Sequence, residues 1–240
     1  MADKKLDYFD KFLPDQSEHT YHYKGNEADL IAALYQSIVD SSAIEDPLKK
    51  LKLTVTDKFT LPEMASNPIM LRFYELITRL INAKYVLEIG TFVGVSTMAF
   101  ADGIADGGKV YTCEKFDHFA DIARKNFTAN GYDKKIELIE GDAFENMDLL
   151  PKDINFDLIF IDGNKERYKD YFESLEPLLS PNGVIIVDDC FFHGDVYNDK
   201  PQTEKGQGTK DFLDAAAKRD DYVRLALPLS NGVYIMMKKS

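Results

Sequence analysis

Residues 86–101 read VLEIGTFVGVSTMAFA and decide the fold of this chain. An apolar run ends at Glu88-Ile89-Gly90, a short turn closes at Gly94, and small and apolar residues follow at helical spacing. This order of strand, glycine turn and helix opens nucleotide-type α/β sites, in which N–H groups at the helix start face a bound ligand. The stretch therefore predicts a ligand site at the carboxyl end of this strand.

Apolar, partly β-branched runs recur along the rest of the chain and predict further strands. Helical patterns separate the first six strands, which implies right-handed crossovers. Residues 228–232, PLSNG, are too few for a crossover helix, so the last two strands should pair antiparallel. We therefore predict a doubly wound, seven-stranded, mostly parallel sheet with an antiparallel C-terminal hairpin. The predicted strands are Tyr85–Ile89, Val110–Cys113, Ile136–Ile139, Leu158–Ile161, Val184–Val187, Tyr222–Leu227 and Val233–Met237, and the helices between them are Val95–Gly103, Asp117–Asn130, Phe144–Leu149, Glu166–Leu179 and Gly208–Lys218.

The residues before the sheet should form an N-terminal arm and helices, over 1–60, that cap the larger domain over 61–240 or contact a second subunit. Apolar residues at helical spacing predict one helix from Glu27 to Val39 and another over Ile69–Asn82. Two segments are candidates for an acceptor pocket or a dimer contact: Tyr21–Tyr23 and Pro62–Met70.

The charge balance and the cysteine content narrow the classes of function. The chain of 240 residues carries 41 Asp and Glu against 29 Lys and Arg, and this net charge of -12 opposes binding to nucleic acid or to an anionic membrane. Cys113 and Cys190 lack metal-type spacing, so we expect buried thiols in a reducing compartment. The polar start MADKKLDYFDKF lacks the apolar core of a secretion signal, and no apolar run is long enough to span a membrane. We expect a cytoplasmic protein that acts on small molecules.

Acidic residues end five consecutive strands of the predicted sheet. In a parallel sheet, ligands bind outside the carboxyl ends of the strands, so these side chains should meet at one site. Glu88 stands immediately before the glycine turn, where a carboxylate would repel the diphosphate of a dinucleotide but would suit the amino group of S-adenosylmethionine. The turn Gly90–Gly94 is also not GxGxxG, and we therefore expect S-adenosylmethionine as the cofactor. The acids are Glu88, Glu114, Asp142, Asp162 and the pair Asp188-Asp189.

Two of these acids have expected roles toward the adenosine part of the cofactor. Glu114 ends the second strand, where an acid can accept hydrogen bonds from ribose hydroxyls of either NAD or an adenosyl cofactor. Asp142, in the sequence GDAF, is placed to accept from an adenine amino group. Asp142 could equally be an aspartate that caps a turn or a helix.

Asp162, Asp188 and Asp189 would repel one another strongly unless a cation lay between them. Such a cluster suggests a hard divalent metal held by oxygen, and Mg²⁺ fits because it keeps positions open for water and substrate oxygens. Asp188 or Asp189 could instead cap the following segment. Lys165 would have its pKa lowered beside a metal and a sulfonium, toward the range of a general base, or would form a salt bridge with these acids.

At these residues the chain resembles the cation-dependent O-methyltransferases of the catechol and caffeoyl-CoA type. These are class I S-adenosylmethionine enzymes with a Rossmann-like, seven-stranded sheet whose last strand is reversed. The most diagnostic motif is DxxKxxY at Asp162, Lys165 and Tyr168, because many methyltransferases share the glycine turn. The matching segments, which span Leu80–Lys239, are LINAKYVLEIGTFVGVST, YTCE, GDAF, FDLIFIDGNKERYKDYF, SPNGVIIVDD and PLSNGVYIMMKK.

The resemblance implies a cofactor site, a metal site and one catalytic residue. The metal would be Mg²⁺ or another divalent cation such as Mn²⁺ or Ca²⁺, and Lys165 would assist deprotonation of the acceptor. The implied cofactor-binding residues are Glu88, Gly90 and Ser96 at the methionine part, Glu114 at the ribose, Asp142 at the adenine side, and also Phe92 and Asp162. The implied metal-binding residues are Asp162, Asp188 and Asp189.

Two departures from the family pattern concern the metal and the acceptor. Asp189 stands where the family usually has Asn, and the extra carboxylate would tighten metal binding or change the preferred metal. Residues 191–197, FFHGDVY, replace a shorter insert of many relatives, which leaves the acceptor open. The polar stretch Asn198–Gly208 that follows is predicted to be a loop, either a mobile lid or a plain surface loop.

We expect methyl transfer from S-adenosylmethionine to a hydroxyl of a small, vicinal dihydroxy aromatic acceptor, by a homodimer. Two adjacent oxygens of the acceptor would chelate the metal, which lowers the pKa of the attacking hydroxyl. A competing interpretation is methylation of a hydroxyuridine in tRNA, which the acidic balance opposes because LKKLK at Leu48–Lys52 is the only basic cluster of note in the sequence. A catalytically inactive cofactor-binding protein is a second competing interpretation, and a nicotinamide oxidoreductase is a third.

Overall fold

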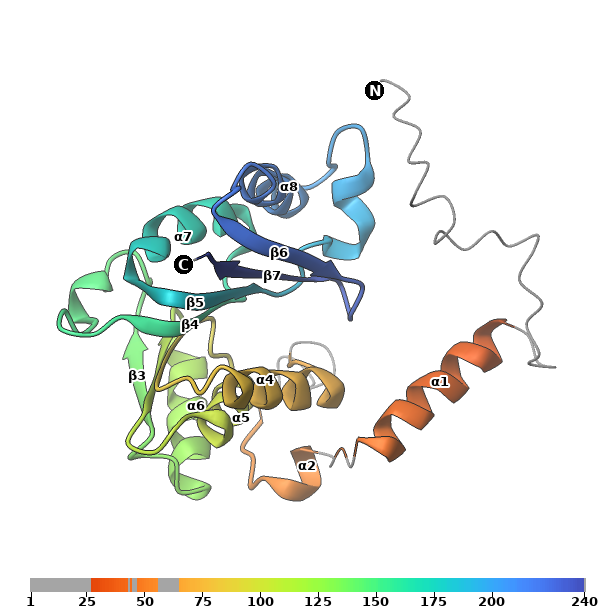
Figure 1. Cartoon of the computed structure of the whole chain (residues 1–240). Helices are drawn as coiled ribbons and strands as arrows, with labels where there is room; N and C mark the ends of the chain where they lie inside the picture. The colour runs from red at the N-terminus through yellow and green to blue at the C-terminus, as the bar shows by residue number, and fades with distance from the viewer. Residues whose placement is uncertain (1–26, 43, 45–46, 56–64, 240) are drawn as a thin grey trace. The chain divides into compact units, whose positions relative to one another are not determined.

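The chain divides into two compact units, Met1–Ala43 and Ile44–Ser240. Residues 21–23 and the first part of Pro62–Met70, predicted to form an acceptor pocket or a dimer contact, lie outside the described residues. No helix within the described part of the chain is long and apolar enough to cross a membrane. The computed structural model, shown in Figure 1, describes residues 27–42, 44, 47–55 and 65–239.

Helix α1 (Glu27–Ser41) is the regular element described in the first unit, and it agrees with the helix predicted from Glu27. Gln36 donates a side-chain hydrogen bond to Asp40 over 2.8 Å, one turn farther along the helix. The apolar side chains Leu34 and Ile38 are also one turn apart, and both are exposed. Helix α1 therefore has the amphipathic pattern that the sequence indicated.

A seven-stranded sheet forms the centre of the second unit, with the strand order β3-β2-β1-β4-β5-β7-β6. Strands β3, β2, β1, β4 and β5 pair in parallel, whereas β7 pairs antiparallel with both β5 and β6. The predicted fold, including the C-terminal hairpin, is therefore confirmed. The strands are β1 (Tyr85–Ile89), β2 (Lys109–Glu114), β3 (Ile136–Glu140), β4 (Phe156–Ile161), β5 (Leu179–Val187), β6 (Tyr222–Leu227) and β7 (Val233–Lys238).

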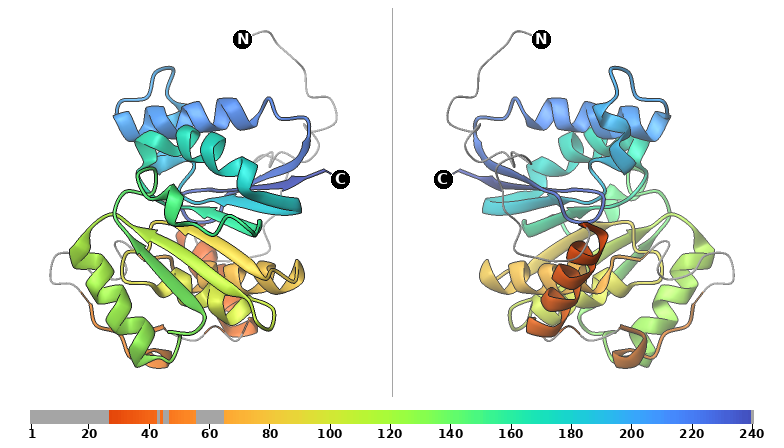
Figure 2. Two further views of the ribbon diagram at one scale, coloured as in Figure 1. Left: turned by 90° about the vertical axis from the view of Figure 1, so that its left-hand side faces the viewer. Right: turned by 90° about the vertical axis from the view of Figure 1, so that its right-hand side faces the viewer.

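Helices cover both faces of the sheet, as the two side views in Figure 2 show. Side chains from α4, α5 and α6 pack with Val86 on one face, and side chains from α7 and α8 pack with Leu87 on the other. Because successive strand residues point to opposite faces, one strand contributes to both cores. The helices of this unit are α2 (Pro47–Lys50), α4 (Pro68–Leu80), α5 (Val95–Gly103), α6 (Asp117–Ala129), α7 (Tyr168–Leu175) and α8 (Glu204–Ala216).

Two predicted helices are shorter than the sequence pattern indicated. The segment predicted as a helix over Phe144–Leu149 contains only the 3-10 turn Met147–Leu149, because Asp142 and Asn146 direct their side chains to the backbone around it. The segment predicted over Glu166–Leu179 splits into a 3-10 turn, α7 and a second 3-10 turn that contains Pro177. Proline lacks the N–H that a continuing helix would need.

The polar stretch predicted as a loop over Asn198–Gly208 is partly helical, because α8 begins at Glu204. The Thr203 side chain caps this helix by accepting the N–H of Gly206. A Cβ at Gly208 would collide with the backbone of Lys165 and Glu166, so the small residue permits close packing there. Gly208, one of the glycines that suggested a loop, therefore permits close contact between α8 and the segment that follows β4.

Candidate active site

The strand ends form one continuous edge, because backbone hydrogen bonds extend past the strands. The N–H groups of Gly90, Gly141, Asp162 and Asp188 each donate to a carbonyl oxygen near the end of a neighbouring strand, over 2.8–3.0 Å. Each acid that follows a strand is thereby held in register with its neighbours. The structure brings the predicted acidic residues to this edge of the sheet.

Glycine at position 90 allows the turn after β1 to approach the end of β4. Gly90 has a φ of 100°, a left-handed value that residues with a side chain rarely adopt. A Cβ built on Gly90 would lie only 2.5 Å from the carbonyl oxygen of Asp162. The turn and the first acid of the predicted metal site are therefore in direct backbone contact.

Glu88 lies at the end of β1 with no exposed surface, and hydroxyl groups surround its carboxylate. Ser96 donates to Oε1 over 2.6 Å, and Thr112 donates to Oε2 over 2.6 Å. The hydroxyl of Thr97 donates to the same Oε2. The start of α5 and the neighbouring strand β2 therefore supply three donors to one carboxylate.

Burial raises the pKa of Glu88 to about 7, although the three hydroxyl hydrogen bonds act to lower it. A buried carboxylate loses its hydration, and the charged form becomes less favourable. Such a group costs stability, and acids of this kind concentrate at functional sites. Glu88 and Ser96 are adjacent, with Ser96 the more exposed of the two, and their role at the methionine part of the cofactor stays a prediction.

Glu114 supports the glycine turn from the end of β2. Its Oε2 accepts the backbone N–H groups of Thr91 and Phe92, over 3.2 and 2.8 Å, and its Oε1 accepts the N–H of Phe116 over 2.9 Å. Phe92 has a φ of 51°, so the carboxylate holds a non-glycine residue in the left-handed region. Burial raises the pKa of Glu114, against the effect of these N–H donors. The predicted ribose ligand is therefore also a structural part of the turn.

Asp142 has the capping geometry that the sequence left open. Its Oδ1 accepts the N–H of Phe144 over 3.0 Å, and its Oδ2 pairs with Lys115 over 3.0 Å. Partial burial alone would raise its pKa, but the bonds to Lys115 and Phe144 outweigh it and lower the pKa. Asp142 thus ends its strand as an ionised, half-buried carboxylate beside the edge.

Lys165 bridges two of the three predicted metal ligands. Its Nζ lies 3.1 Å from Oδ1 of Asp162 and 3.1 Å from Oδ2 of Asp189. The Tyr168 hydroxyl donates to the backbone oxygen of Asp188 over 3.0 Å and lies 3.4 Å from Oδ1 of Asp162. Lys165 and Tyr168 of the DxxKxxY motif therefore contact both Asp162, the first residue of the motif, and the Asp188-Asp189 pair.

The protein groups around Lys165 favour its charged form. Burial acts to lower the pKa of its ammonium group, but Tyr168, Asp162 and Asp189 together raise it above the ordinary value. The lowered pKa expected for a lysine beside a metal and a sulfonium stays a prediction. The alternative prediction, a salt bridge to the same acids, is what the structure contains.

The contact between Tyr74 and Asp188 was not predicted from the sequence. The pattern of α4 placed Tyr74 among the apolar side chains of a helix face, yet its hydroxyl donates to Oδ2 of Asp188 over 2.5 Å. Thr97 and Thr112 were missed for a related reason, because their contacts to Glu88 depend on strand register and helix phase. A polar tip on an otherwise apolar residue was the only signal available for Tyr74.

The oxygen donors of the site fit a hard divalent cation by their chemistry. Burial, together with the charges of Asp162 and Asp189, raises the pKa of Asp188 to about 7, because one ammonium does not balance three carboxylates. Within the described residues, no three Asp, Glu, His or Cys side chains are already grouped as metal ligands. The Lys165 ammonium lies instead between two of the acids.

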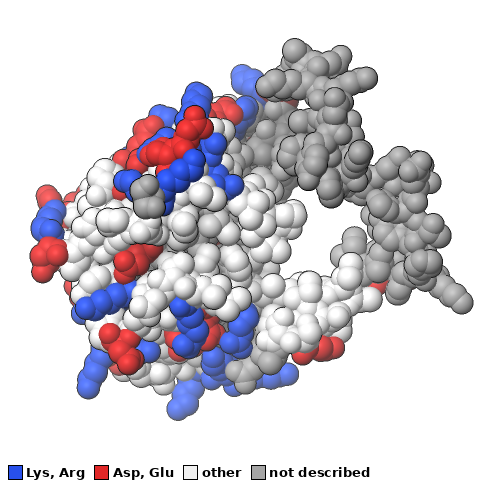
Figure 3. Space-filling view, viewed as in Figure 1, with Lys and Arg blue, Asp and Glu red and all other residues white. Residues whose placement is uncertain are grey.

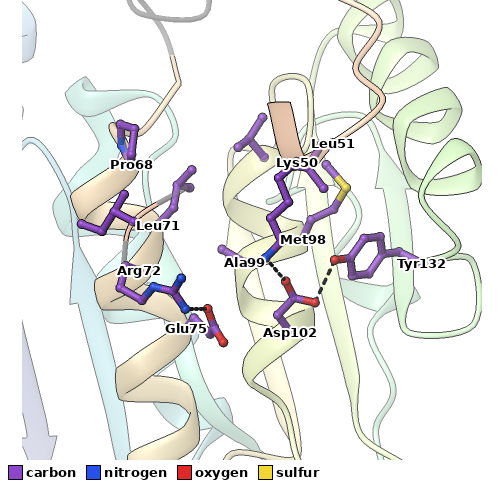
Figure 4. Close-up of a pocket in the computed structure, with 12 residues that line it drawn as sticks. Lys50, Leu51, Pro68, Leu71, Arg72, Glu75, Met98, Ala99, Asp102 and Tyr132 are labelled. Carbon is purple, nitrogen blue, oxygen red and sulfur yellow. Dashed lines mark hydrogen bonds and ion pairs between the residues drawn. The ribbon is translucent and has the colours of Figure 1, made fainter. Parts of the chain in front are cut away.

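A pocket between α4 and α5 is lined by a different set of residues (Figure 4). Its Asp102 pairs with Lys50 over 3.4 Å and accepts the Tyr132 hydroxyl over 2.8 Å. None of the residues predicted to bind cofactor or metal lines the pocket, and of the predicted acceptor segment it includes Pro68. Its polar groups are engaged with one another.

The fold, the glycine turn and the acidic strand ends together define an S-adenosylmethionine-dependent O-methyltransferase. The sequence pattern of the O-methyltransferase family matches residues 39–239. The chain belongs to that family.

Individual relatives agree with this assignment over most of the chain. The chain is 31% identical over 203 residues to O-methyltransferase ankF of Aspergillus thermomutatus, an alignment that covers 77% of this chain and 83% of that protein. It is 30% identical over 228 residues to caffeoyl-CoA O-methyltransferase 2 of Petunia hybrida, with 87% and 91% covered. The crystal structure of an O-methyltransferase from Bacillus cereus in complex with SAH is similar with a TM-score of 0.71 at 27% identity, covering 85% of this chain and 90% of that one.

Proposed function

We propose that this enzyme transfers a methyl group from S-adenosylmethionine to a hydroxyl of a small, catechol-like acceptor in a reaction that depends on a divalent cation. The observation that carries the proposal is the Lys165 ammonium between Asp162 and Asp189, next to Asp188 and directly against the turn at Gly90. Similarity to a caffeoyl-CoA O-methyltransferase supports an aromatic acceptor with adjacent oxygens.

Asp162, Asp188 and Asp189 would hold the cation, which when bound acts as a Lewis acid toward the acceptor hydroxyl. Lys165 keeps a positive charge beside this position, so it favours the oxyanion that attacks the methyl group and shares its proton. Ser96 and Glu88 would orient the methionine part of the cofactor, and Glu114 would fix its ribose while holding the turn. Positioning and electrostatics account for the acceleration, without a covalent enzyme intermediate.

The acceptor and the cation can be tested in one experiment. Enzyme dialysed against EDTA is offered labelled methyl donor with catechols, hydroxycinnamoyl thioesters, hydroxyflavonoids or tRNA, each with and without Mg²⁺. We expect transfer to vicinal dihydroxy acceptors that falls by roughly 10²-fold without the cation, because Lewis-acid stabilisation contributes several kcal/mol.

Matched acceptors with a single hydroxyl are the control, because they lack the second oxygen needed for chelation. Undiminished transfer in EDTA would contradict cation dependence. Transfer to tRNA but to none of the small acceptors would contradict the acceptor class and favour the nucleic-acid alternative.

The free cysteines are consistent with a cytoplasmic location, which we also propose. Cys113 and Cys190 are both buried and unpaired. Burial raises the pKa of each thiol to about 12, so neither is a reactive thiolate at neutral pH. Free, inert thiols are usual in a reducing compartment.

We further propose that two copies of the chain associate through an apolar face formed by the β6–β7 hairpin together with Leu76 and Leu80 of α4. Figure 3 shows an area without Lys, Arg, Asp or Glu over the β6–β7 hairpin, whereas α4 also carries Arg72, Glu75 and Arg79. Because each copy carries a net charge of -12, an apolar face is where two copies can meet with least repulsion. Strand β6 is also an edge strand of the sheet. The exposed apolar side chains of this face are Leu76, Leu80, Val223, Leu225 and Met237.

Leu225→Lys should convert the dimer into a monomer, because it buries a charge in the contact without touching either core. Leu225 is 56% exposed, so we expect the folded subunit to keep its stability. Light scattering during size-exclusion chromatography measures the mass. Leu149→Lys, at a side chain that is 63% exposed outside this face, is the control and should remain dimeric. A monomeric wild-type protein, or a dimeric Leu225→Lys variant, would contradict this interface.

A further inference from the structure

Tyr74 reaches the candidate metal site from a helix that carries none of the predicted site residues. Its hydroxyl donates to Oδ2 of Asp188 over 2.5 Å, across 114 residues of sequence. Both residues are removed from solvent, with exposed fractions of 0% for Tyr74 and 5% for Asp188. The hydrogen bond therefore forms in a low-dielectric environment, where its directional effect on the carboxylate is strongest.

The position of the Tyr74 hydroxyl is fixed by packing as well as by this hydrogen bond. The Tyr74 ring stacks on Phe100, with centroids 5.1 Å apart and an interplanar angle of 22°, and packs against Phe160 with centroids 4.8 Å apart. The side chain of Ser66 is hydrogen-bonded to the same phenol. The ring would therefore stay in place if the hydroxyl alone were removed.

The three carboxylates are held in two different ways. Lys165 lies 3.1 Å from one oxygen of Asp162 and 3.1 Å from one of Asp189. Asp188 takes part in none of the ion pairs among the described residues; its Oδ1 accepts the backbone N–H of Asp189 over 2.8 Å, and its Oδ2 accepts the Tyr74 hydroxyl. The orientation of Asp188 is therefore set by Tyr74 and the backbone rather than by the lysine.

We propose that Tyr74 is a positioning residue for methyl transfer: its hydroxyl fixes the orientation of the Asp188 carboxylate and so sets the affinity of the site for a divalent cation. This inference rests on the cation dependence proposed above. A carboxylate oxygen has two lone pairs, so an oxygen that accepts from Tyr74 keeps one for a metal. Side chains that orient a ligating carboxylate typically change metal affinity 10–100-fold when they are removed.

Tyr74→Phe removes the hydroxyl and keeps the ring, and cation binding is measured on the full chain without cofactor or acceptor. Titration calorimetry with Mn²⁺ and with Mg²⁺ should give an affinity roughly tenfold weaker than that of the wild-type protein. The rise in melting temperature on adding Mn²⁺, taken against each variant's own cation-free baseline, should shrink accordingly. This second measurement remains informative if Tyr74→Phe is less stable.

Tyr222→Phe is the matched control. Tyr222 is also buried, and its hydroxyl donates to a carboxylate, Glu176, away from the site, over 3.2 Å. It should leave cation affinity unchanged. Equal affinities of Tyr74→Phe and wild type, or an equal loss in Tyr222→Phe, would overturn the role of Tyr74 while leaving the proposed function intact. A wild-type protein that binds neither cation would overturn the proposed cation dependence itself, and the role of Tyr74 with it.

Discussion

Lys165→Met should lower kcat by roughly 10²–10³-fold, the range typical for loss of a charged group that stabilises a developing oxyanion. The ammonium group lies 3.1 Å from Asp162 and 3.1 Å from Asp189, so its removal also leaves two carboxylates without their counter-charge. The affinity for S-adenosylmethionine should change much less than kcat, because Asp162 is the predicted cofactor residue that Lys165 pairs with and the residues assigned to the methionine part and the ribose lie elsewhere. Initial rates at saturating donor and calorimetric titration of the cofactor separate the two quantities.

Lys169→Met is the control for Lys165→Met, because Lys169 lies one turn farther along and pairs with Glu173 on the surface. It should keep wild-type kcat. Lys165→Arg distinguishes charge from proton transfer, since arginine keeps the charge but does not act as a base. With the pKa of Lys165 raised, we expect Lys165→Arg to retain more activity than Lys165→Met. A loss of less than tenfold in Lys165→Met, or a parallel loss of cofactor affinity, would contradict the assigned role.

The fold could be predicted from the sequence because local patterns and topology rules agreed. Three features of the sequence each allowed one arrangement of the strands. They are the glycine turn at Gly90, the alternation of strands and helices, and the short loop before β7. The start of α8 could not be predicted, because Gly206 and Gly208 have low helix propensity. Packing of Gly208 against the backbone of Lys165 outweighs that propensity, and such a contact is absent from any local pattern.

The acids of the candidate site could be predicted for a similar reason, since each one ends a strand and parallel strands end at one edge. The side chains that donate hydrogen bonds to these acids could not be predicted. The hydroxyls of Thr97 and Thr112 reach Glu88 through helix phase and strand register, and Tyr74 reaches Asp188 from a helix packed across the sheet. Strand register and helix packing are tertiary properties. The sequence therefore indicated which acids lie at the site but not which side chains orient them.

Glu88→Gln should stabilise the protein at pH 8 and weaken cofactor binding. The pKa of Glu88 is raised from 4.5 to about 7, so the folded state binds its proton more tightly than the unfolded state. Stability from this group is fully present below about pH 4.5 and is lost as the pH rises through about 7. The charged form therefore costs roughly 3 kcal/mol at pH 8, and a neutral amide of the same shape avoids that cost.

Urea unfolding of both proteins at pH 5 and pH 8 measures this effect. The advantage of Glu88→Gln should be large at pH 8 and small at pH 5, while other titrating groups cancel in the difference. Glu137→Gln, on the surface beside Lys109, is the control and should show no such pH-dependent gain. Cofactor affinity should fall in Glu88→Gln alone, because in the role proposed for Glu88 its carboxylate charge would complement the amino group of S-adenosylmethionine. A variant that is less stable than wild type at pH 8 would contradict the stability cost of the charged Glu88. A variant that binds the cofactor equally well would contradict the role of Glu88 toward the cofactor.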